Sequence, residues 1–587
     1  MRFKQLFRRK SLEVLLAEMA GEHRLHRVLG PVALTCLGVG AIIGAGIFAI
    51  TGRVAALESG PAIMISFVVA SVACLFAALC YSEFAAMAPV AGSAYTYTYA
   101  TLGEFFAWII GWDLILEYAM SCSVVAAHWT GYFNEFLYLS FGWRIPPQWT
   151  SDPFTAAEGY AGQTYVNLPA MLVMLVITWI LVVGIRESAL TNAILVVVKL
   201  AVVLLVIVLG FNYVNREHWT GLPVEKRHVT DLADFIQRHP DLASALPPDA
   251  VHATTEGEDL IKAHPAFAAK LSPEEKAHIK QLPNEVKKWG LLGLFGVKDW
   301  LHPLDEAVRS PFAPYGFSGI MVGAALVFFS YIGFDSISTH AEEAVNPQRD
   351  VPIGIIGSLL LCTLLYMLVS AVITGMEPYY DIETKAPIAA AFRKQAEAHG
   401  NPLLNGSAWI ISVGALAGMT SVLLVTFLSQ SRIFLAMARD GLLPNSIFGV
   451  VHERYRTPHR STMITGACII VAAGLLPIRM LEEMVSIGTL LAFVMVCLAV
   501  LILRVTRPDV RRPFRAPAIW AVAPLGALVS FAMMAFLPLD TWARLIVWLG
   551  LGLAIYFFYG MHHSRLGHEL QREIQQHGMS PTDAPLK

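Results

Sequence analysis

A series of long apolar stretches constrains this chain more than any other feature. Each stretch is long enough to cross about 30 Å of hydrocarbon as a helix. With 56% hydrophobic and 15% charged residues, the composition indicates a polytopic membrane protein rather than several soluble domains. Because a bilayer offers no water to backbone polar groups, the expected fold class is all-α. We predict twelve transmembrane helices, at residues 31–52, 61–86, 103–138, 167–185, 191–214, 316–340, 352–375, 406–436, 461–479, 483–505, 516–535 and 543–561.

Basic residues predict which ends of these helices face the cytoplasm. If the basic N-terminal tail (1–30) lies inside, both arginine-rich loops also fall inside, as the Lys and Arg excess of short cytoplasmic loops requires. The arginines concerned are Arg432, Arg439, Arg454, Arg456 and Arg460, and Arg504, Arg507, Arg511, Arg512 and Arg515. The C-terminal tail (562–587) is then cytoplasmic too. A net charge of −2 gives no indication of a nucleic-acid partner.

The first and sixth predicted spans have glycine-interrupted centres, which predict broken helices. Five glycines fall between Gly38 and Gly52, and a second interruption lies in SYIGFDSIS at residues 330–338. Transporters place substrate at such breaks, because the N–H groups and positive dipole end of a half-helix attract a carboxylate. Close packing of two helices through glycine is the alternative.

The two interrupted spans also suggest an inverted repeat. Five predicted spans precede a long polar stretch and seven follow it, and two groups of five helices have opposite topology because five is odd. We expect a first repeat at 31–214, a second at 316–505, and two accessory helices at 506–561.

Residues 215–315 are expected to form an extracytoplasmic (periplasmic) insert. Ser272 is followed by Pro273, Glu274 and Glu275, a pattern typical of a helix N-terminus. Large apolar residues are too few for a big core, so we predict a small cap of short helices. The insert has no nucleophile, metal or phosphate motif, and all seven cysteines lie in apolar spans, where packing is their expected role. No cofactor is therefore expected.

Charged residues inside the predicted spans are candidates for function. Counted from Asn192, Lys199 lies about 10 Å into the fifth span. A charged lysine at a helix centre costs roughly 2.5 to 3.5 kcal/mol, and burial favours its neutral form, so a proton could be taken up and released there. A lysine that extends to the cytoplasmic interface is the alternative. For Glu117 and Asp335 a structural hydrogen-bond network is favoured over ligand contact. His128 is expected to be a packing residue with its hydrogen bonds satisfied rather than a proton relay.

Seven motifs stand out along the chain: GVGAIIGAGIF, YSEFAAMAPVAGSAYTY, GWDLILEYAM, TNAILVVVKLAVV, FFSYIGFDSISTHAEEAVNPQRDVPIGI, AGMTSVLLVTFLSQSRIFLAMARDGLLP and SIGTLLAF. Together they resemble the cationic amino acid transporter family of the amino acid, polyamine and organocation superfamily. The resemblance covers nearly all the chain except the insert. The flanks of the insert, 217–221 and 310–319, look like one short linker that has been split, so we expect the insert to be dispensable for transport.

The resemblance implies a bacterial inner (plasma) membrane protein with five plus five inverted helices and two more, moving amino acids with protons. Lys199 matches the proton-site lysine of the family, which favours a proton role over an interfacial one. The proton would then be the coupling ion.

The resemblance also implies a substrate site built from both helix breaks and the eighth helix. The N–H groups that would bind the substrate carboxylate are those of Gly44, Ala45 and Gly46. The carbonyls that would bind the ammonium are those of Ile42, Phe329, Ser330 and Ile332. Phe334 would close over the substrate as an external gate, and Met419 would border its side chain.

The family name promises cationic substrates, yet the expected pocket residues are apolar, and an unpaired guanidinium or ammonium would be costly there. The residues therefore favour small or neutral amino acids, with cationic ones as additional substrates. A proton symporter that imports amino acids is the first hypothesis and an amino acid exchanger the second. A non-transporting amino acid sensor or partner subunit is the third. A membrane enzyme is the least favoured, because HExxH, GxSxG and paired carboxylates are absent from the loops.

Overall fold

The fold is described from a computed structural model. The structure describes residues 6–10, 29–87, 93–155, 163–184, 189–221, 232, 235–236, 239–247, 250, 257–273, 275–276, 279, 285–334, 337 and 344–568. Within these ranges, eight helices are long and apolar enough to cross a membrane, and four more apolar helices are shorter. Each predicted stretch falls on one of these helices. The all-helical membrane-protein class is therefore confirmed.

In chain order the apolar helices are α3 (Pro31–Ile42), α5 (Ile63–Met87), α7 (Glu104–Phe141), α8 (Leu168–Val183), α9 (Ala189–Gly210), α19 (Gly316–Val327), α21 (Pro347–Met376), α23 (Pro402–Arg439), α25 (His459–Leu475), α26 (Ile478–Thr506), α27 (Ile519–Ala535) and α28 (Leu539–Ile555). Shorter helices connect them: α4 (Thr51–Val54), α6 (Ser93–Thr101), α22 (Pro387–His399) and α24 (Asn445–Phe448). The short helix α29 (Met561–His563) follows α28.

Local sequence explains where several of these helices begin and end. Proline occupies the first turn of α3, α8, α21 and α23, where a missing N–H costs nothing. The Asn167 side chain accepts a hydrogen bond from the Ala170 N–H at the start of α8. Gly142 and Gly184 end α7 and α8 in the left-handed conformation that favours glycine.

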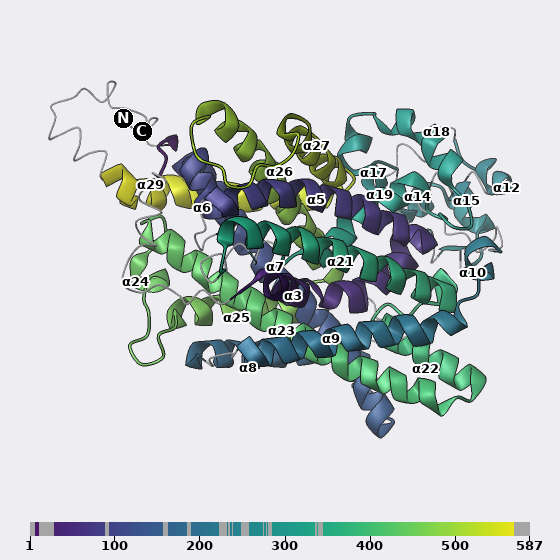
Figure 1. The fold of residues 1–587 in the computed structure, drawn as a ribbon. Coiled ribbons are helices and arrows are strands. Elements are labelled where there is room, and N and C mark those ends of the chain that lie inside the picture. The colour runs from purple at the N-terminus through teal and green to yellow at the C-terminus, as the bar shows by residue number, and fades with distance from the viewer. Residues whose placement is uncertain are drawn as a thin grey trace.

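The axes of the long helices are roughly aligned with one another (Figure 1). α7 packs along α23 and α26, and α5 packs along α21, with α3 held between α21 and α9. On the outer faces of α8, α9 and α28, exposed apolar side chains such as Trp179, Val208 and Val547 fit contact with lipid rather than water.

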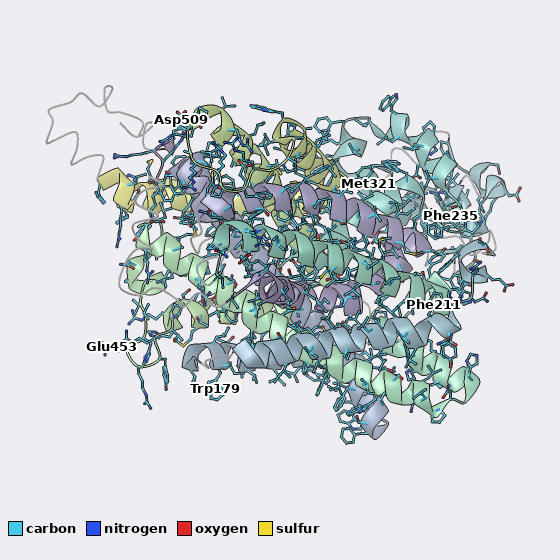
Figure 2. The ribbon with its side chains drawn as sticks, viewed as in Figure 1. Trp179, Phe211, Phe235, Met321, Glu453 and Asp509 are labelled. Carbon is cyan, nitrogen blue, oxygen red and sulfur yellow. The ribbon has the colours of Figure 1, made fainter. Side chains whose placement is uncertain are left out.

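The two ends of the helix bundle differ in charge and composition. Figure 2 labels Glu453 and Asp509, in the arginine-rich loops, at one end, and Phe235, in the insert, at the other. We call these the arginine end and the insert end. Glu83 of α5 accepts two 2.7 Å hydrogen bonds from Arg504 of α26, so residues near 83 and 504 belong to the arginine end.

The described part of the insert contains α10 (Glu217–Thr220), α12 (Pro240–Ala243), α14 (Gly257–Ala263), α15 (Pro265–Lys270), α17 (Glu285–Leu294) and α18 (Lys298–Val308). Leu232, Phe235, Leu260, Phe267 and Ile279 share a small core of their own. The N-terminal pattern predicted at Ser272 forms a capping box. The Glu275 N–H donates to the Ser272 hydroxyl, the Ser272 N–H donates to the Glu275 carboxylate, and these bonds lower the pKa of Glu275.

Candidate functional site

The first apolar span is a broken helix. α3 ends at Ile42, Ile43 is extended (φ −72°, ψ 104°), and a wide π-helical turn (Gly46–Ile50) follows. The prediction of a break in this glycine-rich stretch is confirmed. The first N–H groups of a helix have no intrahelical partner. The helix restarts after Ile43 at Gly44, Ala45 and Gly46, and all three residues are buried.

A second break lies in the sixth span. α19 ends at Val327, a tight 3-10 turn (Phe328–Tyr331) follows, and Ile332 is non-helical (φ −57°, ψ 133°). Gly333 has φ 116°, which favours glycine, and a Cβ there would lie 2.9 Å from the Ala41 carbonyl oxygen. The second break therefore packs directly on the last turn of α3.

The two breaks touch each other at Gly46 and Ser330. A Cβ on Gly46 would lie 2.5 Å from the Cβ and 2.6 Å from the Cα of Ser330, so only glycine allows this approach. The Ser330 hydroxyl is buried and has no hydrogen-bond partner among the described residues. A buried polar group without a partner is rare in proteins. At this position it is available to a ligand.

Tyr366 of α21 joins the two breaks. Its buried hydroxyl lies 2.7 Å from the Ser330 carbonyl oxygen and 3.0 Å from the Ile42 carbonyl oxygen. These are two of the four carbonyls expected to bind a substrate ammonium. Sequence reasoning missed Tyr366, because a tyrosine inside an apolar span gives no signal of its partners.

Lys199 of α9 reaches the first break. Its Nζ donates a 2.7 Å hydrogen bond to the Gly40 carbonyl oxygen, and the side chain is buried. In an unbroken helix this carbonyl would accept from the N–H of Gly44, four residues on. Lys199 thus bonds to backbone freed by the break, whereas the alternative of a lysine extending to the interface would leave it exposed.

Met419 of α23 is buried beside the same break. On this helix Val422 faces Gly44, where a Cβ would lie 2.8 Å from the Val422 side chain. Residues three apart share a helix face, so Met419 also borders this region. Its neighbour Gly418 faces the stem of Lys199 and the ring of Phe48, both 3.5 Å from a Cβ at that position.

Phe329 and Phe334 flank the second break differently. Phe329 lies in the 3-10 turn and is buried beside Ser330. Phe334 packs against Tyr81 and Phe493, with ring centroids 5.9 and 5.3 Å away. Tyr81 lies toward the arginine end of α5, two residues before Glu83, whereas Phe493 lies near the middle of α26. The role of Phe334 as an external gate stays a prediction.

The other candidates are Glu117, Asp335 and His128. Glu117 is buried on α7, and Asp335 lies outside the described residues. The Nε2 of His128 lies 3.0 Å from a carboxylate oxygen of Glu482, which gives the buried ring the polar partner that a satisfied packing residue requires. Among the described residues, no group of histidine, cysteine and acidic side chains could hold a metal ion.

A profile of the amino acid permease family matches residues 29–246 and 290–557, which is most of the chain and includes both broken helices. The chain belongs to this amino acid permease family. It is therefore a transporter of amino acids or related solutes and not an enzyme, and the resemblance to the amino acid, polyamine and organocation superfamily is confirmed.

Relatives of the permease include bacterial and eukaryotic transporters. A branched-chain amino acid permease of Bacillus subtilis is 38% identical over 562 residues, covering 96% of this chain and 99% of the relative. A methylthioribose transporter of the same species is 35% identical over 561 residues, with the same coverage. A vacuolar cationic amino acid transporter of Arabidopsis thaliana is 34% identical over 508 residues, covering 86% of this chain and 68% of the relative.

Buried carboxylates hold helices together toward both ends of the bundle. At the insert end, Glu482 of α26 forms an ion pair with Arg53 of α4 and lies within hydrogen-bond distance of His128 of α7. At the arginine end, Glu83 accepts from Arg504 and also from the Ala516 N–H, which lies 2.9 Å away. Removing a partner would leave a buried charge uncompensated.

Proposed function

We propose that the permease imports small or neutral amino acids by proton symport with alternating access. The observation that carries the proposal is the hydrogen bond from Lys199 to the Gly40 carbonyl. It connects the one lysine within the fifth span to the backbone of the first helix break, beside the expected substrate groups.

The two breaks supply complementary partners for an α-amino acid. N–H groups at Gly44, Ala45 and Gly46 suit a carboxylate, and the carbonyls of Ile42, Phe329, Ser330 and Ile332 suit an ammonium. In the described state, Tyr366 bonds two of these carbonyls and Gly46 abuts Ser330. A substrate would therefore separate the breaks and take over part of this bonding.

Apolar neighbours support a neutral substrate side chain. Met419, Val422 and Phe329 lie around the breaks, and a cationic head among them would lack a partner. The branched-chain specificity in the name of the 38% identical relative agrees with this preference.

Lys199 is proposed to carry the coupling proton. Protonated, its ammonium holds α9 to the first break and stabilises the substrate-ready state. Deprotonated, it loses a charge-assisted bond and favours the inward-open state. A coupling free energy of about 1 to 3 kcal/mol would change substrate affinity by about 5- to 150-fold.

The proposed architecture is a five-plus-five inverted repeat, 31–214 and 316–505, with two accessory helices at 506–561. Breaks in the first helix of each group support it. The shared position of the two arginine-rich loops supports a cytoplasmic arginine end in a bacterial plasma membrane. The insert end would then be external.

Uptake into proteoliposomes tests the coupling. With an alkaline interior, the wild type should accumulate a neutral amino acid against its gradient. Lys199→Met should abolish this accumulation while still binding substrate, because the backbone groups at the breaks remain. The control is Lys385→Met, which removes an exposed lysine and should transport normally. Gradient-driven accumulation by Lys199→Met would place the proton elsewhere, with Glu117 as the next residue to replace.

The same vesicles separate the rival functions. An exchanger would take up label only when unlabelled amino acid is loaded inside, and a sensor would bind amino acids without uptake. A panel that includes leucine, alanine, arginine and methylthioribose assigns the substrate class. Uptake of methylthioribose with no amino acid competing would contradict the proposed ammonium and carboxylate sites.

A further inference from the structure

An apolar patch lies on the last two helices of the insert. It lies on α17, α18 and the turn between them, and we call it the α17–α18 patch. Phe295 is 74% exposed and Trp300 is 84% exposed, and the other exposed members are Leu294, Val297 and Leu304. A segment surrounded by water rarely exposes so many neighbouring large apolar side chains.

The start of this segment is fixed to the end of α27. Gly290 has φ 55°, and a Cβ there would lie 2.2 Å from the Leu537 carbonyl oxygen and 2.6 Å from that of Ala535. The buried ring of Trp289 packs on Phe536, with centroids 5.9 Å apart. Residues 535–537 form the turn from α27 to α28, so α17 leaves the bundle at the level where these membrane helices end.

The end of the segment is fixed to α19. The buried Asp305 of α18 accepts a 2.6 Å hydrogen bond from the Ser318 N–H in the first turn of α19. Gly316, with φ 68°, leaves room for this carboxylate, which a Cβ there would approach within 2.7 Å. In Figure 1, α17 and α18 accordingly lie beside α19, near the end of α27. The segment is therefore held along the rim of the bundle.

The surface of α27 near this attachment is apolar as well. Leu528 and Phe531 are exposed on α27, and Phe531 lies about one helical turn before Ala535, where α17 is attached. Exposed aromatic side chains at this depth are typical of a membrane–water interface. Short amphipathic helices with a Trp- and Leu-bearing face lie in that plane.

We propose that the α17–α18 patch is embedded in the interface of the lipid leaflet on the insert side. The segment thereby anchors the insert beside the accessory helices α27 and α28. Among its described residues, the part of the insert around Phe235 and Phe267 exposes no large apolar side chain, and it extends from this anchor into water. The assignment is independent of the transported substrate and of proton coupling.

Photo-crosslinking in intact cells tests the anchor. p-Benzoyl-phenylalanine replaces Trp300 in the full-length permease, and mass spectrometry identifies the adduct after irradiation. Position 300 should yield phospholipid adducts. The control, Ser244, is exposed in the part of the insert with its own core and should yield none. A protein adduct at position 300, or no lipid adduct, would overturn the proposal.

Tryptophan quenching in lipid nanodiscs provides a second measurement with milder substitutions. The emission of Trp300 is obtained as the difference between wild type and Trp300→Phe. Brominated lipid chains should reduce it at least twofold, while aqueous iodide should change it little. The difference for Trp149→Phe reports an exposed tryptophan outside the patch and should be quenched by iodide instead. If iodide, and not brominated lipid, quenched the emission of Trp300, the patch would face water and the proposal would be wrong.

Discussion

In the proposed substrate site, single groups at the helix breaks are the expected partners of the substrate. Ser330 presents a buried hydroxyl without a described partner, and Gly46 lies against it because it lacks a side chain. At the first break, the Lys199 ammonium donates a hydrogen bond to the Gly40 carbonyl oxygen. The sequence analysis predicted a role for all three residues. For Ser330, however, it named the backbone carbonyl and not the side-chain hydroxyl.

Ser330→Ala should weaken substrate binding without destabilising the permease. The hydroxyl loses no described partner, so the melting temperature should stay constant or rise. One lost hydrogen bond to substrate corresponds to about 0.5 to 1.5 kcal/mol, or roughly 2- to 12-fold in affinity. Ser530→Ala removes another buried hydroxyl without a described partner, on α27, and should leave affinity unchanged. Equal affinities for both variants would remove the Ser330 hydroxyl from the site.

Met419→Ser should broaden the range of accepted side chains. A long thioether beside the first break fills space that a serine would leave open, so longer substrates such as arginine should compete better. Competition against labelled substrate measures the change. Met174→Ser, at a buried methionine of α8, is the control for a general effect of removing a core side chain. An unchanged competition profile for Met419→Ser would place Met419 outside the pocket.

At the scale of helices, α21 holds the two broken helices in register. Tyr366 is its contact with both breaks, and the bond partners Ile42 and Ser330 belong to different predicted repeats. Broken helices could be anticipated from glycine because its effect on the backbone is local. The role of α21 in joining the two breaks could not be anticipated, because it depends on which of the many apolar helices packs beside them.

Tyr366→Phe should lower both thermal stability and substrate affinity. Loss of the hydroxyl removes the single donor that two buried carbonyls share, at a cost of about 1 to 3 kcal/mol. Tyr315→Phe also removes a buried hydroxyl, which bonds the Ala56 carbonyl at 2.6 Å, so it should cost similar stability. Substrate affinity should fall only for Tyr366→Phe. A parallel loss of affinity in both variants would attribute the effect to stability alone.

On the scale of the whole molecule, the insert consists of two parts with different attachments. The first part has its own small core at residues 232–279. The second part, α17 and α18, is packed into the transmembrane bundle through Trp289 and Asp305. The family profile covers the chain up to residue 246, in the first part, and resumes at residue 290, in the second. Because only the second part packs into the bundle through Trp289 and Asp305, we predict that the first part is the dispensable one.

Two deletions test this division. Removing residues 222–284, with a flexible linker from Gly221 to Glu285, should preserve membrane insertion and uptake because the bundle contacts remain. Removing 222–309 also takes away Trp289 and the Asp305 cap of α19, so it should reduce the folded yield and uptake. Normal uptake after the larger deletion would restore the simpler expectation that the entire insert is dispensable.

The sequence by itself determined the membrane class, the helical stretches, the first helix break and the family, because apolarity, glycine and motif identity act locally along the chain. It also identified Lys199 as a charge that needs a special environment. Only the tertiary structure decided that Tyr366 joins the breaks, that Phe334 packs on Tyr81 and Phe493 and that α18 caps α19. Those contacts join residues from 13 to 324 positions apart. Their partners depend on how the helices pack, which no local pattern in the chain specifies.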